Sequence, residues 1–136
     1  MFTTLTVLPD YRLAWGRCSG QVVREDVLAM LGELVEDPQW TVGGDLVIDF
    51  SQARSVVLDL HDLQQIAQFV DANMGRLGTG GTTVIVSADL FVRTLGELFI
   101  VQRRAIPRKI RTARTLADAE ETLGLPTGLI SLRASA

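Results

Sequence analysis

The sequence predicts an α/β protein built on a single-layer, mixed and mostly parallel five-stranded sheet with about four helices, in the order β-β-α-β-α-β-α-β-α. Short apolar runs alternate with segments in which apolar residues recur every three or four positions. Strands that alternate with helices join through right-handed crossovers and form parallel sheets. We expect one domain over residues 1–126 and a C-terminal tail, residues 127–136, that frays.

The first half of the chain contains a hairpin, a helix and a buried strand. Residues 5–8 and 12–18 flank Pro-Asp-Tyr, which favours a turn, so they predict two antiparallel strands that end at Gly20. Residues 24–36 carry apolar side chains at helical spacing. Residues 46–50 form an apolar run typical of a strand that is covered on both faces.

The next segments are a helix, a strand and a second helix. Asp59 is a natural N-cap for a helix that runs to Leu77 and closes at Gly78. The run TTVIVSA predicts another buried strand, after which Asp89 caps a helix through Gln102. This last helix is apolar over much of its circumference, which predicts burial on more than one side.

The last predicted elements are a charged edge strand and a short helix. A strand around Ile110 belongs to the segment 103–114, which holds almost half of the positive charge and suits a solvated sheet edge. Thr115 and Asp118 resemble a capping box, and Gly124 with the following proline ends the helix.

Composition argues against several classes of function. A net charge of −3 and a pI near 5.1 disfavour nucleic acid as a partner, because phosphate contacts need a dominant basic surface. No apolar run approaches the ~18 residues of a membrane span, and the first residues lack the pattern of a signal peptide. Cys18 is the only cysteine, so no internal disulfide is expected. We expect a cytoplasmic protein with no membrane span.

The order of segments resembles a known family. A hairpin followed by GQVVREDVLAMLGELVEDPQW, LVIDFSQA, DLHDLQQIA, TTVIVSADL and ARTLADAEETLG is similar to the SpoIIAA-like branch of the STAS superfamily, the anti-sigma-factor antagonist fold. The similarity covers about residues 5–124. It implies a regulatory domain that works through protein partners.

The same resemblance implies a serine switch that this chain lacks. Family members carry a phosphorylatable serine at the corner that leads into the second main helix, where this chain has Asp59, Leu60, His61 and Asp62. Without a hydroxyl, phosphate cannot be added at this corner. The two carboxylates either imitate a phosphorylated corner or serve as an ordinary N-cap and first-turn acid. His61 is either a pH-sensitive group or an exposed first-turn residue.

No catalytic, metal or cofactor site is expected. A nucleophilic dyad of Cys18 and His61 would need a closeness that the sequence does not show. One Cys and one His do not make a structural zinc site. The neighbouring acids Glu25 with Asp26, Glu36 with Asp37, and Glu120 with Glu121 are expected on solvated helix faces.

The helix from 90 to 102 is the best candidate for an interface or for the wall of a pocket. We expect Phe91, Leu95, Leu98 and Phe99 to pack inward, while Val92, Ile100 and Val101 point partly elsewhere. An ordinary core helix is the competing interpretation.

The sequence therefore predicts a non-enzymatic, STAS-like protein-interaction or regulatory module without the serine switch. Its helix faces would recognise a protein partner or a second copy of the chain, giving a dimer. The alternative is a site for a small hydrophobic or lipid ligand, because SpoIIAA-like domains resemble the lipid-binding core of CRAL-TRIO proteins. The identity of the partner or ligand does not follow from the residues.

Overall fold

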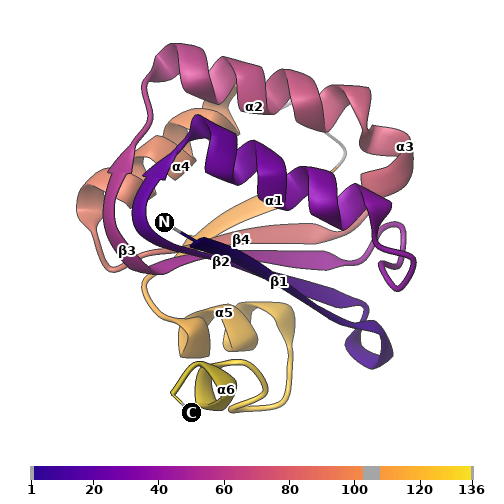
Figure 1. Ribbon diagram of the computed structural model, residues 1–136. Helices are drawn as coiled ribbons and strands as arrows, with labels where there is room; N and C mark the ends of the chain where they lie inside the picture. The colour runs from indigo at the N-terminus through magenta and orange to yellow at the C-terminus, as the bar shows by residue number, and fades with distance from the viewer. Residues whose placement is uncertain (1, 103–107, 136) are drawn as a thin grey trace.

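The computed structural model describes residues 2–102 and 108–135, and side chains within 3–99 and 108–134. Its strands are β1 (Phe2–Leu8), β2 (Leu13–Val23), β3 (Asp45–Val57), β4 (Thr82–Val86) and β5 (Lys109–Ala113). Its helices are α1 (Arg24–Glu36), α2 (Leu60–Ala72), α3 (Met74–Leu77), α4 (Leu90–Gln102), α5 (Leu116–Leu123) and α6 (Ser131–Ser135), and a 3-10 turn, η1, spans Pro9–Tyr11. The predicted α/β fold is confirmed (Figure 1).

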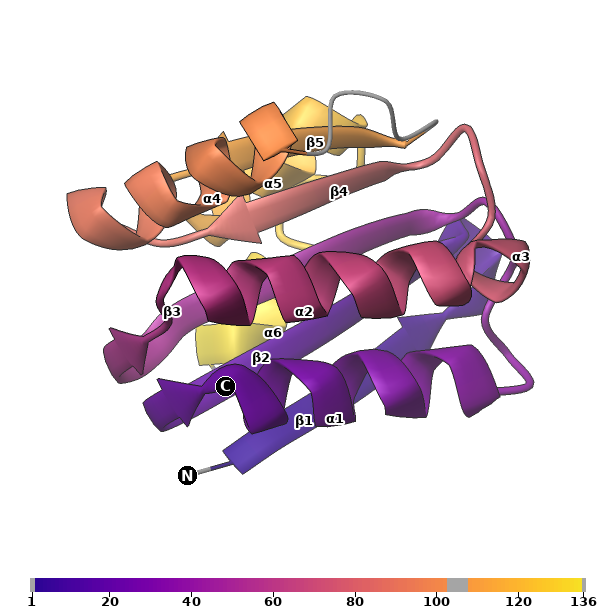
Figure 2. The same ribbon diagram turned by 90° about the horizontal axis from the view of Figure 1, so that it is seen from above.

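The five strands form one sheet in the order β1-β2-β3-β4-β5. β1 is antiparallel to β2, and the other neighbouring strands are parallel. Figures 1 and 2 show α1, α2 and α4 on one face of the sheet, and Figure 1 shows α5 and α6 on the other. The helices on both faces explain the unbroken apolar runs of the central strands, because alternate side chains enter different cores.

Each face of the sheet has its own core. Leu46 and Phe50 of β3 belong to the core under α1, α2 and α4. Val47, between them in sequence, joins Val84 and Val86 of β4 in the smaller core against α5 and Ile130. The period of two along each strand therefore divides the apolar residues between the two faces.

Two strands are longer than predicted. β2 does not end at Gly20 but continues to Val23, with an irregular register and a left-handed φ of 74° at Gly20. β3 continues beyond Phe50 to Val57 and stays paired with β2 to the Val23–Val57 pair. Residues 51–55 are mostly polar and lack the apolar pattern that predicts a strand, because this end of β3 is mostly exposed.

The predicted helix that runs to Leu77 is two helices. α2 ends at Ala72, and the Asn73 side chain donates to the Phe69 carbonyl at 2.9 Å. α3 then adds one turn before Gly78, whose φ of 89° ends it. The predicted cap residues Asp89 and Thr115 do accept hydrogen bonds from the first turns of α4 and α5.

Two acids that were expected on solvated faces are buried. The Asp26 carboxylate accepts from the backbone N–H of Val23 at 2.8 Å and fixes the start of α1. Glu120 is 2% exposed and accepts from the N–H groups of Gly128, Ile130 and Ser131 at 3.0, 2.7 and 2.9 Å. Burial opposes ionisation of Glu120, but these hydrogen bonds outweigh it and lower its pKa.

The final segment, expected to fray, packs against α5 through this carboxylate. Ile130 is fully buried in the core on the α5 face, and α6 follows it. The backbone N–H groups of this segment replace the lost hydration of the Glu120 carboxylate, and these charge-assisted hydrogen bonds hold the segment against α5.

A glycine sets the distance between α1 and the sheet. Gly16 lies in the middle of β2, and a Cβ there would overlap Sδ of Met30, which is fully buried on α1. Only a residue without a side chain lets the helix lie this close to the strand.

We expect Gly16→Ala to lower the free energy of unfolding by about 1–3 kcal/mol, because Met30 must move in a packed core. Gly32→Ala, on the same helix as Met30 with nothing within 4 Å of the added carbon, is the matched control and stabilises by up to about 1 kcal/mol. Urea denaturation measures both. Equal midpoints for the two variants would contradict this account of the α1–β2 contact.

Candidate functional site

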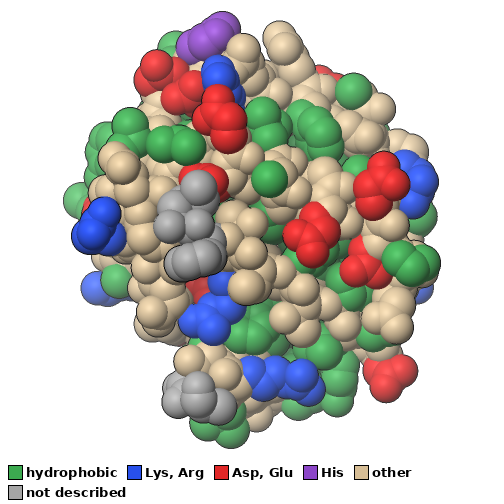
Figure 3. Space-filling model, in the orientation of Figure 1, with side chains coloured by type: hydrophobic (Ala, Val, Ile, Leu, Met, Phe, Trp, Pro, Cys, Tyr) green, Lys and Arg blue, Asp and Glu red, His purple; other side chains and the backbone are tan. Residues whose placement is uncertain are grey.

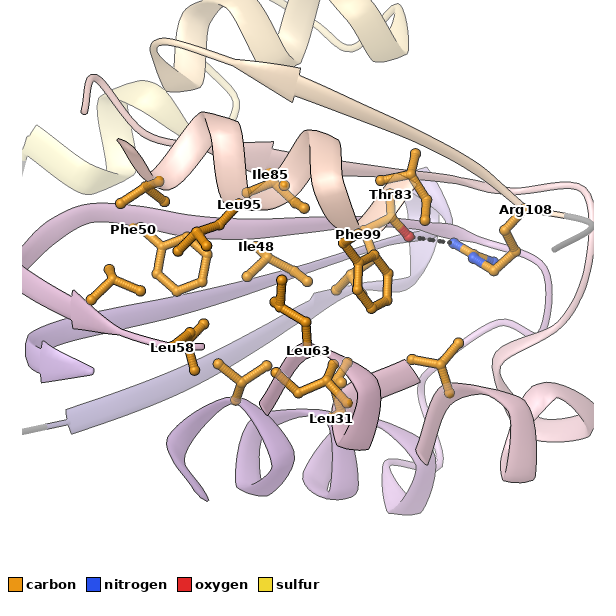
Figure 4. Close-up of a pocket in the computed structure, with 18 of the residues that line it drawn as sticks. Leu31, Ile48, Phe50, Leu58, Leu63, Thr83, Ile85, Leu95, Phe99 and Arg108 are labelled. Atoms are coloured by element: carbon orange, nitrogen blue, oxygen red, sulfur yellow. Dashed lines mark hydrogen bonds between the residues drawn. The ribbon is translucent and has the colours of Figure 1, made fainter. Parts of the chain in front are cut away.

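An apolar cavity of about 90 Å³ lies between the sheet and the helices α1, α2 and α4. Its walls come from all of these elements (Figure 4). They include Leu31 and Leu63 from α1 and α2, Leu95 and Phe99 from α4, Ile48 and Phe50 from β3, and Ile85 from β4. Because protein interiors usually leave few voids larger than a water molecule, a cavity of this size is a candidate ligand site.

The cavity follows from how the helices are spaced. α2 packs beside α1, whereas α4 packs over β4 and β5, as Figure 2 shows. Gly96 lets α4 approach the sheet, since a Cβ there would lie 3.3 Å from Cδ1 of Ile85 and 3.2 Å from Cγ2 of Thr112. The face of β3 between these two helix positions is therefore not fully covered, and its side chains line the cavity.

One end of the cavity is polar and contains Arg108 and Thr83 (Figure 4). Arg108 is 8% exposed, and its guanidinium donates to the carbonyls of Gly44 at 2.8 Å and Gly78 at 3.1 Å. Longer contacts of 3.5 Å join it to the Leu77 carbonyl and the Thr83 hydroxyl. Burial lowers the pKa of Arg108, and the charge of nearby Asp45 opposes that shift.

Arg108 corrects the prediction of a solvated basic edge over 103–114. Lys109, Arg111 and Arg114 are exposed on or beside the edge strand β5, as expected, but Arg108 is inside. Residues 103–107 lie outside the described residues. Nothing local distinguished Arg108 from its charged neighbours, because its acceptors on Gly44 and Gly78 lie 64 and 30 positions away in the sequence.

The face of α4 that packs inward differs from the predicted one. Val92, Leu95 and Phe99 are buried and line the cavity, whereas Phe91 is 58% and Leu98 45% exposed. The buried stripe passes through positions 92, 95, 96 and 99, which includes Gly96, a position that the apolar pattern alone did not mark. The side chains of Ile100 and Val101 lie outside the described residues.

The corner before α2 is an N-cap. Asp59 accepts from the backbone N–H of Asp62 at 2.8 Å, and Asp62 accepts from the N–H of Asp59 at 3.0 Å, which completes a capping box. The hydrogen bond from the Asp62 N–H is the main reason that the pKa of Asp59 is lowered. Asp62 also forms an ion pair of 3.4 Å with Arg24 of α1. Both carboxylates are thus engaged in holding α2 in place.

His61 and Cys18 do not form a dyad. His61 is exposed at the start of α2, and Figure 3 shows the histidine projecting beside acidic and basic side chains. Cys18 is fully buried on β2 in the core against α1. Burial, together with Asp26 and Asp49, raises the pKa of the thiol to about 12.

Asp49 is a buried acid with a structural environment. Its carboxylate accepts from the Trp15 indole N–H at 3.1 Å and from the N–H of Ser51 at 2.8 Å, and Arg17 pairs with it at 3.4 Å. Arg17 also lies over the Trp15 ring, 5.0 Å from its centre. These contacts satisfy the charge and join β2 to β3.

Residues 2–102 and 108–135 contain neither a group of metal-ligating side chains nor a membrane-spanning helix. In these ranges no three His, Cys, Asp or Glu side chains are grouped so that they could hold a metal ion. No helix there has the length and apolar character needed to cross a bilayer.

Two solved structures share this fold. One, described as the anti-sigma factor antagonist SpoIIAA in its unphosphorylated form, has a TM-score of 0.51 and 12% identity, covering 90% of this chain and 98% of that one. The other, an uncharacterized protein of the DUF3478 family with a SpoIIAA-like fold from Shewanella loihica PV-4, has a TM-score of 0.52 and 15% identity, covering 90% and 92%. No family model and no curated protein matches the sequence.

These comparisons define the class of protein by its fold. The chain has a SpoIIAA-like fold, as the order of its segments predicted. At 12% and 15% identity the likeness concerns the fold alone, so the function must be argued from this chain's own residues.

We expect the Cys18 thiol of the native protein not to react with Ellman's reagent at neutral to mildly alkaline pH, because the thiolate is disfavoured and the sulfur is covered. In guanidinium chloride the thiol should react at once. A Cys18→Ala, Ala88→Cys double variant places a thiol at an exposed position and is the control that reacts in the native state. Fast labelling of native Cys18 would contradict its place in the core.

Proposed function

We propose that this chain is a non-enzymatic STAS-like module that binds a small apolar ligand in the cavity between α1, α2, α4 and the sheet. The apolar cavity of about 90 Å³ is the observation that carries the proposal. The corner at residues 59–62 supports this proposal, because Asp59 and Asp62 cap a helix there and offer no hydroxyl for phosphate. Regulation by a ligand would replace regulation by phosphorylation. A cytoplasmic location stays a prediction.

The cost of an empty cavity supports the same proposal. At about 24 cal/mol per Å³, a cavity of about 90 Å³ left unfilled lowers stability by about 2 kcal/mol. A ligand that fills it restores the missing dispersion contacts and binds only the folded chain. Binding should therefore be visible as an increase in thermal stability.

The size of the cavity limits the ligand. An apolar cavity of roughly 150 Å³ in another protein holds benzene, so about 90 Å³ suits a compact molecule or one end of a longer chain. With about six to eight non-hydrogen atoms contributing about 0.5–1 kcal/mol each, the expected Kd lies between about micromolar and millimolar.

We expect pentanol or hexanol at about ten times its Kd to stabilise the protein by about 1.4 kcal/mol, which raises Tm by about 4 °C. Leu63→Phe places a larger side chain in the cavity and should remove this shift. Leu132→Phe makes the same change at an exposed position on α6 and should retain it. Differential scanning calorimetry measures Tm for all three proteins.

Two outcomes would overturn the ligand-binding proposal. In one, no probe raises Tm of the wild-type protein. In the other, Leu63→Phe remains folded and responds to the probes as the wild type does.

A second candidate function is recognition of a protein partner or of a second copy of this chain. Leu90, Phe91 and Leu98 of α4 are exposed, and Leu60 is exposed at the start of α2. Exposed apolar side chains that lie together on one helix mark a protein–protein interface, whereas single exposed ones are normal on any surface. One similar structure is described as an anti-sigma factor antagonist, and this description also motivates a protein partner.

We expect the wild-type chain to sediment as a dimer and the double variant Phe91→Ser, Leu98→Ser as a monomer, because the changes remove apolar area from an exposed face without entering the core. Leu132→Ser, equally exposed on α6, is the control and should leave the mass unchanged. Analytical ultracentrifugation measures the mass. A wild-type monomer at every concentration tested would reject self-association through α4.

A further inference from the structure

We propose that the ligand of the cavity carries a single carboxylate that binds Arg108 and Thr83, with a compact apolar body in the rest of the cavity. The inference rests on the proposed function and adds the chemical class of the ligand. Carboxylic acids with a short aliphatic or aromatic body are the molecules that fit.

The polar groups of the cavity meet at one end. Arg108 comes directly before β5 and Thr83 lies in β4, and these strands are neighbours in the sheet. The remaining polar side chain of the lining is that of Trp40, whose indole N–H donates to the Arg76 carbonyl at 3.0 Å. A ligand would therefore meet apolar side chains along the cavity and two hydrogen-bond donors at its end (Figure 4).

The guanidinium retains donor capacity. Its two short hydrogen bonds, to Gly44 and Gly78, use one N–H on each terminal nitrogen. The contacts of 3.5 Å to Leu77 and Thr83 are at the limit of hydrogen bonding and leave the other two N–H groups poorly satisfied. Each terminal nitrogen therefore has an N–H that can donate to a carboxylate oxygen of a ligand.

The charge of Arg108 also lacks a close counter-ion. Within the part of the chain that the structure describes, its hydrogen-bond acceptors are neutral carbonyls and one hydroxyl, and no carboxylate forms an ion pair with it. Asp45 acts on it from a distance, while an Asp45 oxygen accepts from the N–H of Thr82 at 3.0 Å. A buried cation without a paired anion is costly, so the carboxylate of a ligand would be the counter-ion that Arg108 lacks.

The same features exclude other ligand classes. An ammonium group would repel Arg108. A sugar would leave its hydroxyls unpaired against apolar walls. A phosphate monoester carries close to two negative charges, and the described residues of the lining offer a single cation. A monocarboxylate matches both the charge and the number of donors.

Three probes with the same six-carbon chain test the proposal by isothermal titration calorimetry at neutral pH. These are hexanoate, hexanol and hexylamine. We expect hexanoate to bind the wild-type protein tighter than hexanol by about tenfold or more, and hexylamine not to bind. Raising the salt concentration should weaken hexanoate and leave hexanol unchanged, because the charge pair is partly screened.

Two variants locate the head group. Thr83→Val keeps the shape of the side chain and removes the hydroxyl, and it should reduce the preference for hexanoate over hexanol several-fold. Arg108→Gln should abolish the preference while hexanol still binds. Because Arg108 also joins the loops at Gly44 and Gly78, this variant is first checked for its native circular dichroism spectrum, and Thr83→Val carries the test if it unfolds.

The outcomes separate the two proposals. If hexanol binds as tightly as hexanoate, or if Thr83→Val and a folded Arg108→Gln keep the full preference for hexanoate, the carboxylate assignment is overturned and the apolar site stands. If neither hexanol nor hexanoate binds, and pentanol also fails to raise Tm, the ligand-binding function falls together with this inference.

Discussion

The need to cover β3 and β4 on both faces is the constraint on which the rest of the structure depends. Side chains of these strands alternate between two cores, so helices must lie above and below them. On one face α1 and α2 lie together while α4 follows β4 and β5, and the crossover connections leave the face of β3 between them. The cavity is a result of this spacing, and its walls are the same side chains that form the core.

The amino-terminal ends of β3, β4 and β5 are joined by hydrogen bonds to backbone carbonyls. Gly43 donates to the Leu77 carbonyl at 2.9 Å, and the guanidinium of Arg108 reaches Gly44 and Gly78 across the same junction. The glycines allow these loops to approach closely enough for one buried cation to serve several carbonyls. A structural role and a ligand-binding role for Arg108 are compatible, because its two weak contacts remain available.

The corner that carries a phosphorylatable serine in the resembling family has a different chemistry in this chain. Its acids form a reciprocal cap, and Asp62 is further tied to Arg24 of α1. These carboxylates stabilise the start of the helix. The cavity lies in the interior of the domain, between the sheet and the helices, and none of the residues 59–62 lines it.

The sequence by itself determined the order of the main helices and strands and the starts of the four predicted helices, because periodicity and caps such as Asp59 and Thr115 act over a few residues. Only the tertiary structure decided which charges are buried. Glu120 is held by backbone groups eight to eleven positions away, and Arg108 by carbonyls 30 and 64 positions away. The inward face of α4 and the cavity also depend on how separate elements pack. Contacts between distant segments leave no local pattern in the chain, and for that physical reason the candidate site became visible only in three dimensions.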